Sequence, residues 1–64
     1  MIINGKRQSE IVKGTVVQVL LDLDLQMDRV VVEVNGMIIP KANYSTHLID
    51  EDSKVEIVSF VGGG

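Results

Sequence analysis

The chain ends in three consecutive glycines, Gly62, Gly63 and Gly64, which follow a run of strand-forming residues. A glycine turn needs further chain to turn back to, so we interpret the glycines as a tail that carries a free α-carboxylate on Gly64. Three extended residues span roughly 10 Å, and without a Cβ atom Gly62 and Gly63 could enter a narrow channel of a partner. The Gly64 carboxylate is the candidate reactive group. The alternative is a disordered end without a chemical role.

Other candidate chemical groups are weaker. Asp22 and Asp24 stand two positions apart, so on a helix their carboxylates point to different sides and shared metal ligation is not expected. The acidic run at 50–52 is interpreted as a solvated turn with at most a weak electrostatic role. The single histidine, His47, has no visible triad partner, and one imidazole cannot build a metal site. We therefore predict no catalytic residue and no metal site in the chain.

Size and charge limit the classes of protein that the chain can represent. It has 64 residues and no cysteine, so one small domain must be held by burial of its aliphatic side chains. The formal net charge is -3 and the isoelectric point about 4.8, which disfavours nucleic acids and anionic membranes as partners. No apolar run approaches the ~20 residues that span a bilayer, and no targeting segment is visible, so we expect a cytoplasmic protein.

Two Asn-Gly pairs predict two β-hairpins, because both residue types accept the positive φ angles of a type I′ turn. The predicted hairpins cover residues 1–12, with the turn at Asn4-Gly5, and residues 30–39, with the turn at Asn35-Gly36. The alternating valines of the second hairpin suggest a central strand. Pro40 is expected to end that hairpin because it has no backbone donor.

Thr15 and Gln18 form a capping box that predicts the start of a helix. The apolar residues that follow recur on one helical face, which predicts an amphipathic helix of about three turns. They are Val16, Val19, Leu20 and Leu23. A buried strand is the alternative for this valine-rich segment.

The remaining segments complete the predicted order of strand, strand, helix, strand, short strand, strand. Asn43 is expected to cap one helical turn at 44–46, residues 50–53 to form a polar turn, and residues 54–61 to form the last strand. One helix packed across a small mixed β-sheet, an α+β fold, buries the helix stripe and one face of the sheet.

The last predicted strand carries apolar side chains on both faces. Val55 and Ile57 share one face, whereas Glu56, Val58 and Phe60 share the other. If the first pair faces the helix, Val58 and Phe60 form an exposed apolar surface beside the tail, which we interpret as a partner-docking patch. The alternative is that the strand twists or bulges and that Phe60 belongs to the core.

The order of these elements, the length and the glycine end together resemble the ThiS family, the β-grasp sulfur carriers of thiamine biosynthesis within the ubiquitin-like group. The resemblance covers essentially the whole chain and implies a β-grasp domain over residues 1–61 with a flexible tail over residues 62–64. Its segments are, in order, Asn4-Gly5, Gly14-Thr15, residues 34–40, and residues 55–58 leading through Phe60 and Val61 to the glycines.

Two positions depart from the family pattern. Asp52-Ser53 stands where the family usually has a Gly-Asp turn, so that turn is expected to be less tight. The tail has three glycines where the family signature requires two, so Gly63 and Gly64 are the residues that carry over, and Gly62 lengthens the tail.

The resemblance implies that the chain is a carrier acted on by other enzymes and not an enzyme itself. A ThiF-type adenylating enzyme, using ATP and magnesium, would convert the Gly64 carboxylate into an acyl adenylate, because a free carboxylate is a poor electrophile. A persulfide sulfur donor would displace AMP and leave a thiocarboxylate. Thiazole synthase, ThiG, would receive the sulfur. No cofactor bound by the chain is implied.

Other functions share this sequence pattern. Sulfur carriers for molybdopterin, cysteine or tRNA thiolation have the same fold and tail. A ubiquitin-like modifier would join Gly64 to a lysine through an isopeptide bond, and a plain interaction domain would have an inert tail. The length and the Asn-Gly-Met-Ile-Ile-Pro segment at 35–40 favour the thiamine branch.

Overall fold

The structure is a computed structural model that describes residues 1–9 and 14–60. The predicted tail of Gly62, Gly63 and Gly64, the expected strand end at Val61, and residues 10–13 of the first predicted hairpin lie outside the described residues. The strands are β1 (Ile2–Ile3), β2 (Lys6–Arg7), β3 (Gly14–Thr15), β4 (Val30–Val34), β5 (Met37–Ile38), β6 (Leu48–Ile49) and β7 (Lys54–Ser59). The helices are α1 (Val16–Asp22) and the short 3₁₀ turns η1 (Met27–Arg29) and η2 (Lys41–Asn43).

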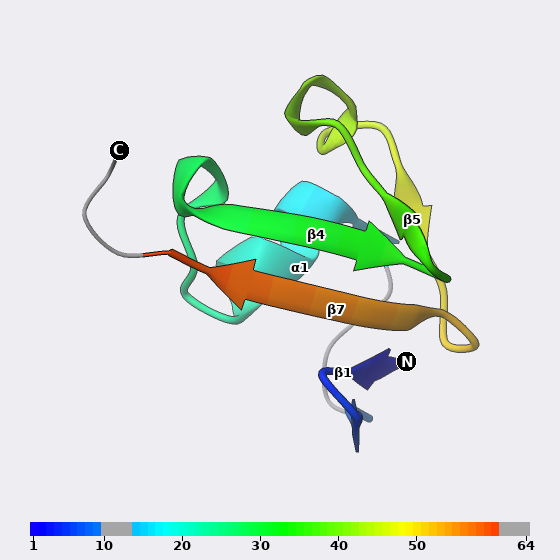
Figure 1. The fold of residues 1–64 in the computed structure, drawn as a ribbon. Helices are drawn as coiled ribbons and strands as arrows, with labels where there is room; N and C mark the ends of the chain where they lie inside the picture. The colour runs from blue at the N-terminus through cyan, green and yellow to red at the C-terminus, as the bar shows by residue number, and fades with distance from the viewer. Residues whose placement is uncertain (10–13, 61–64) are drawn as a thin grey trace.

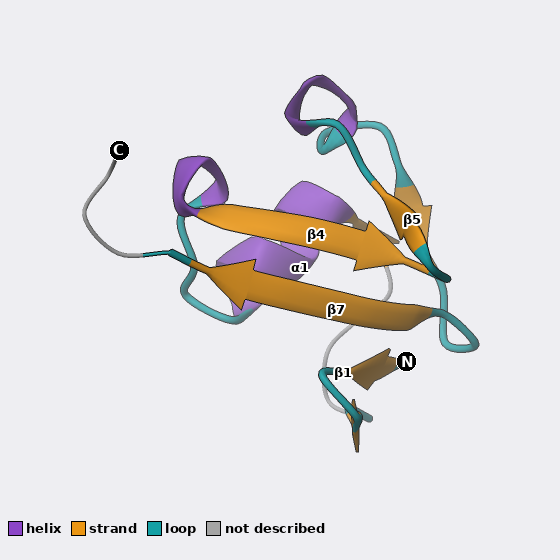
Figure 2. Cartoon of the chain, in the orientation of Figure 1, coloured by secondary structure: helices purple, strands orange, loops and turns teal. Residues whose placement is uncertain are grey.

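The main layer is a five-stranded sheet with the order β2-β1-β7-β4-β5. β1 and β7 are parallel and the other neighbours are antiparallel, so the sheet is mixed. β4 and β7 lie side by side with α1 behind them (Figure 1), and the same two layers are coloured by type in Figure 2. One helix on a mixed sheet confirms the predicted fold class. β4, expected to be central, is interior with a neighbour on each edge, while β7 occupies the middle.

Both Asn-Gly pairs form the predicted turns. Asn4 and Gly5 have φ angles of 50° and 81°, and Asn35 and Gly36 have 52° and 84°. These positive φ angles at consecutive positions are what a type I′ turn requires. The hairpins β1–β2 and β4–β5 are therefore confirmed within the described residues.

The capping box at the start of α1 is present. The backbone N–H of Gln18 donates to Thr15 Oγ1 at 3.2 Å, and the backbone N–H of Thr15 donates to Gln18 Oε1 at 3.0 Å. Gly14 belongs to the same arrangement, because a Cβ atom at this position would overlap Gln18 Oε1. A side chain at residue 14 would displace Gln18 and open the box.

The other donors of the first helical turn are paired by a distant loop. Val16 donates its backbone N–H to the His47 carbonyl, and Val17 donates to the Tyr44 carbonyl, each at 3.0 Å. Tyr44 is buried, and its hydroxyl donates to the carbonyl of Val30 at 3.3 Å. This loop thus joins the start of the helix to the start of β4.

The helix is shorter than the predicted three turns, because it ends at Asp22 with Leu23 as its C-cap. Asp24 takes a positive φ of 59° and donates to the Leu21 carbonyl, and Leu25 donates to the Leu20 carbonyl at 2.9 Å. This pair of bonds is a Schellman motif, in which a left-handed residue stops the helix. A glycine at position 24 would have indicated a helix end, whereas an aspartate there does not. The prediction followed the apolar periodicity through Leu23, so the predicted helix was too long.

Two further differences involve residues 41–49. The expected helical turn at 44–46 is wrong, because the turn η2 ends at Asn43 and its N-cap is Pro40. A second, two-stranded sheet pairs β3 with β6, with Gly14 opposite Ile49 and Thr15 opposite Leu48. Neither two-residue strand has a sequence pattern of its own, so this pairing was missed.

The core lies between α1 and one face of the main sheet. α1 contributes Val16, Val19 and Leu20, all buried to 1% exposure. The sheet contributes alternate residues, which confirms the predicted inward face of the last strand: Ile3, Val30, Val32, Val34, Val55 and Ile57. The opposite face of the sheet is left without a covering helix in the part of the chain that the structure describes.

Candidate functional site

β7, the strand that leads toward the tail, has a neighbouring strand on each edge. β1 pairs with its first residues, and β4 pairs with it as far as Ser59, which lies opposite Val30. The backbone N–H of Phe60 then donates to the Arg29 carbonyl at 3.0 Å. The chain is thus fixed to the sheet up to the residue before Val61, which positions the root of the predicted tail.

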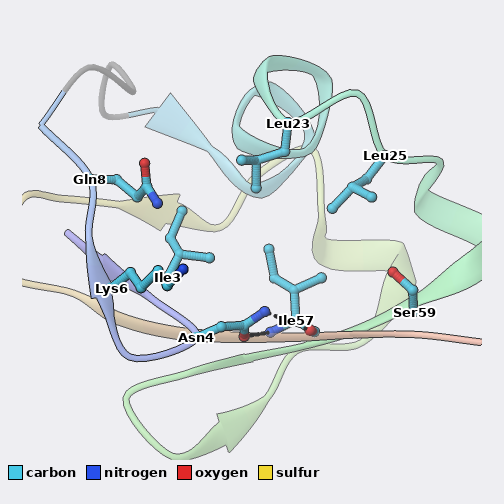
Figure 3. Close-up of a pocket in the computed structure, with 8 residues that line it drawn as sticks. All are labelled: Ile3, Asn4, Lys6, Gln8, Leu23, Leu25, Ile57 and Ser59. Carbon is cyan, nitrogen blue, oxygen red and sulfur yellow. Dashed lines mark hydrogen bonds between the residues drawn. The ribbon is translucent and has the colours of Figure 1, made fainter.

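The side chains of both turn asparagines also hold β7. Asn4 accepts from the Ile57 N–H through Oδ1 at 2.7 Å and donates from Nδ2 to the Ile57 carbonyl at 3.1 Å (Figure 3). This amide takes the place of a neighbouring strand where β1 has ended. Asn35 accepts from the Lys54 N–H through Oδ1 at 2.9 Å. The sequence indicated these residues only through their turn conformation, so their role on β7 was missed.

Replacing Asn4 by aspartate is expected to destabilise the domain by about 1–3 kcal/mol, because the variant loses a donor and sets a carboxylate against the Ile57 carbonyl. Aspartate still tolerates the left-handed turn conformation. The matched control is Asn35→Asp, because the hydrogen bond of Asn35 to Lys54 uses only the oxygen that aspartate retains. Urea unfolding curves measure both; equal losses for the two variants would contradict this assignment.

The predicted docking residues are exposed on the face of the sheet opposite α1. Val58 is 60% exposed and Phe60 is 42% exposed. Val31 of β4, 40% exposed, lies directly opposite Val58. Val31 was missed because only the register between β4 and β7 places it there. We call Val31, Val58 and Phe60 the apolar patch.

An open hollow of about 430 Å³ lies on the other face, between the first hairpin and the end of α1 (Figure 3). Its apolar walls include Leu23, Leu25 and Ile57, and its polar groups are the Lys6 ammonium, the amides of Asn4 and Gln8, and the Ser59 hydroxyl. Among the described residues that line it there is no carboxylate or imidazole, and Lys6 is the one ionisable side chain.

The acidic candidates have local structural roles. Asp24 stops α1, as described above. Asp50 accepts from the Asp52 N–H at 2.9 Å and from the Ser53 hydroxyl at 3.1 Å, while the Ser53 N–H closes the turn onto the Asp50 carbonyl. Asp52-Ser53, which stands where the family usually has a Gly-Asp turn, belongs to this turn, and Ser53 is buried. His47 is partly buried, and its carbonyl caps α1.

Over residues 1–9 and 14–60, no group of three His, Cys, Asp or Glu side chains is placed to hold a metal ion. Within the same ranges, no helix is long and apolar enough to cross a membrane.

Comparison with protein families and solved structures gives one consistent result. A model of the ThiS family matches residues 1–64. The crystal structure of the thiamine biosynthesis protein (ThiS) from Geobacter metallireducens is similar, with a TM-score of 0.78 and 27% sequence identity. The match covers 98% of this chain and 96% of that chain, so the two share the whole β-grasp fold.

Curated relatives include longer proteins. The thiazole synthase of Paramagnetospirillum magneticum is 36% identical over 64 residues, which are 100% of this chain and 20% of that protein. The thiazole synthase of Magnetococcus marinus is 29% identical over 62 residues, which are 97% of this chain and 19% of that protein. This chain therefore spans about a fifth of the length of these relatives.

Proposed function

Because the chain belongs to the ThiS family, we propose that it is a sulfur carrier for thiamine biosynthesis and that the Gly64 carboxylate is its reactive group. The family match over residues 1–64 carries the proposal, since it includes the glycine end as well as the folded domain. The likeness to a ThiS structure and to segments of two thiazole synthases supports the same pathway.

The proposed chemistry occurs on partner enzymes. A ThiF-type enzyme, with ATP and magnesium, joins the Gly64 carboxylate to AMP and releases pyrophosphate, which turns a poor electrophile into a good one. A persulfide sulfur then attacks the carbonyl carbon, AMP leaves, and reduction of the sulfur–sulfur bond by a thiol leaves the thiocarboxylate. Thiazole synthase is the proposed acceptor of this sulfur. The carrier supplies no acid, base or cofactor.

The fold contributes position and access. β7 is paired along both edges near its start, and the Asn4 amide and the Phe60–Arg29 bond hold its later residues. A rigid strand before the tail limits the directions in which the Gly64 carboxylate can be presented, which lowers the entropic cost of aligning it with an activating enzyme. Because Gly62 and Gly63 have no Cβ atoms, they allow the carboxylate to enter a narrow channel of the activating enzyme.

Intact-protein mass spectrometry tests the proposal. After incubation with ATP, magnesium, a ThiF-type enzyme and a persulfide donor, the chain is expected to gain the mass difference between sulfur and oxygen. A covalent adduct with another protein would favour a ubiquitin-like modifier. An unchanged mass, with partners that load a known carrier in parallel, would contradict the proposal.

The apolar patch is proposed to dock on the adenylating enzyme. Phe60→Ser is expected to weaken that binding by about 2 kcal/mol or more, as truncation of an interface aromatic does. The control is Leu48→Ser, which removes a 73% exposed apolar side chain from β6. Calorimetric titration measures both. Unchanged affinity of a folded Phe60→Ser variant, or equal losses for the two variants, would exclude a docking role for Phe60.

A further inference from the structure

Both hairpin turns place a glycine directly after an asparagine, which brings a backbone nitrogen close to a side-chain amide. The glycine nitrogen can attack the carbonyl carbon Cγ of the asparagine before it, and glycine hinders this attack least because it has no Cβ atom. A Cβ atom built at Gly5 or at Gly36 would meet no atom within 4 Å. Both turns are therefore open to water on the side of the glycine.

The two turns are closely matched in their backbone and in one bond of the side chain. The φ angles are 50° and 52° for the asparagines and 81° and 84° for the glycines. Each asparagine donates its backbone N–H to a β7 carbonyl, Asn4 to Val55 at 2.9 Å and Asn35 to Lys54 at 2.7 Å. Each also accepts a β7 N–H at Oδ1, at 2.7 Å for Asn4 and 2.9 Å for Asn35. A difference in reactivity therefore has to come from the rest of the amide and its surroundings.

The amide nitrogen Nδ2 distinguishes the two asparagines. At Asn4, Nδ2 donates to the Ile57 carbonyl at 3.1 Å, so the amide is held at both ends by bonds that are partly buried. At Asn35, the structure gives Nδ2 no partner within residues 1–9 and 14–60, and the bond from Lys54 is exposed. The Asn35 amide turns toward Gly36 for the loss of one exposed hydrogen bond. The Asn4 amide must lose two bonds, and their partial burial makes them stronger.

We propose that Asn35 is a site of spontaneous covalent modification and that Asn4 is protected by the bonds of its amide to β7. The Gly36 nitrogen loses its proton to water and bonds to Asn35 Cγ, the Cγ–Nδ2 bond breaks, and Nδ2 takes up a proton and leaves as ammonia. Water then opens the resulting five-membered imide at either carbonyl. One water is consumed and one ammonia is released, and no group is oxidised or reduced. This inference does not depend on the proposed function.

The two products affect the β4–β5 hairpin differently. Opening of the imide at the side-chain carbonyl gives aspartate, which retains the oxygen that accepts from Lys54. Opening at the main-chain carbonyl gives isoaspartate, in which the backbone runs through the side chain and is one methylene longer. A longer turn does not fit the two-residue connection that sets Val34 opposite Met37. Both products add one negative charge, and the isoaspartate form also disturbs the pairing of β5 with β4.

The test compares the two asparagines within one unmodified chain. The folded chain is incubated in mildly alkaline buffer and, in parallel, in guanidinium chloride, and peptide mapping by mass spectrometry follows the loss of each amide with time. In the folded chain, Asn35 is expected to react at least about fivefold faster than Asn4, the ratio that one additional hydrogen bond at Asn4 produces. In guanidinium chloride, the two are expected to react at similar rates, because glycine follows both. Methylation by an isoaspartate-specific methyltransferase identifies the isoaspartate product.

Three results would overturn the inference. Asn4 could react as fast as Asn35 in the folded chain, or the same ratio could persist in guanidinium chloride, which would assign it to the local sequence. Asn35 could also stay intact in the folded chain during the time in which the denatured chain reacts completely. Sulfur loading takes no part in these measurements, so their outcome leaves the proposed function unchanged.

Discussion

Removal of residues 62–64 is expected to abolish sulfur loading completely and to leave thermal unfolding unchanged. The variant ends at Val61, whose β-branched side chain replaces glycine at the reacting end, and its carboxylate lies roughly 10 Å nearer the domain. A bulky end on a shorter tail cannot occupy a site shaped for glycine. Intact-protein mass spectrometry after incubation with the loading enzymes measures the sulfur gain, and a calorimetric scan measures unfolding.

A single-glycine deletion is the informative control for this experiment. Because the three glycines are consecutive, deleting any one of them gives the same chain, which still ends in two glycines. That chain is expected to accept sulfur, since it retains the end that the family signature requires. Loading of the variant that ends at Val61 would contradict the role of the tail, and loss of its folding would contradict the proposed boundary between domain and tail.

Replacing Leu20 by alanine is expected to destabilise the domain by about 2–5 kcal/mol, the usual cost of removing a buried leucine. Leu20 lies at the centre of the core between α1 and the sheet and is 1% exposed. A chain of this length has a total stability of roughly 3–10 kcal/mol. The variant is therefore expected to lose a large part of the stability of the domain, measured as lower midpoints of urea and thermal denaturation.

The neighbouring residue supplies a control with the same chemical change. Leu21 belongs to the same helix but is 70% exposed. Leu21→Ala is expected to change stability by less than about 0.5 kcal/mol, because it leaves no cavity and alanine favours the helix. Similar losses for the two variants would contradict the assignment of the Leu20 contribution to burial.

The apolar patch shows how far local sequence patterns predict a surface. Alternation in the last strand predicted that Val58 and Phe60 face away from the helix, and both are exposed. Val31 and Glu33 also follow an alternating pattern, but the pattern alone does not say which residues of another strand lie beside them. The antiparallel register of β4 and β7 decides that Val31 meets Val58 and that Glu33 meets Glu56.

Features that depend on neighbouring residues could be predicted from the sequence. Asn4-Gly5 and Asn35-Gly36 specify their turns because these residues accept positive φ angles, and Thr15 with Gln18 specifies the helix start through bonds over three residues. The glycine end and the order of elements were sufficient to indicate the ThiS family. These signals act within a few residues, so they are visible in a linear pattern.

The pairing of distant segments became visible in the folded structure. The tertiary structure placed β7 between β1 and β4, paired β3 with β6, and brought the Asn4 amide to Ile57, across a separation of 53 residues. These pairings depend on which arrangement buries the apolar face of the helix together with the valines of the sheet. The free energy of that burial is summed over the whole core, so no single segment of the sequence reveals it. The position of Phe60 beside Arg29 and the pairing of Val31 with Val58 are consequences of that packing.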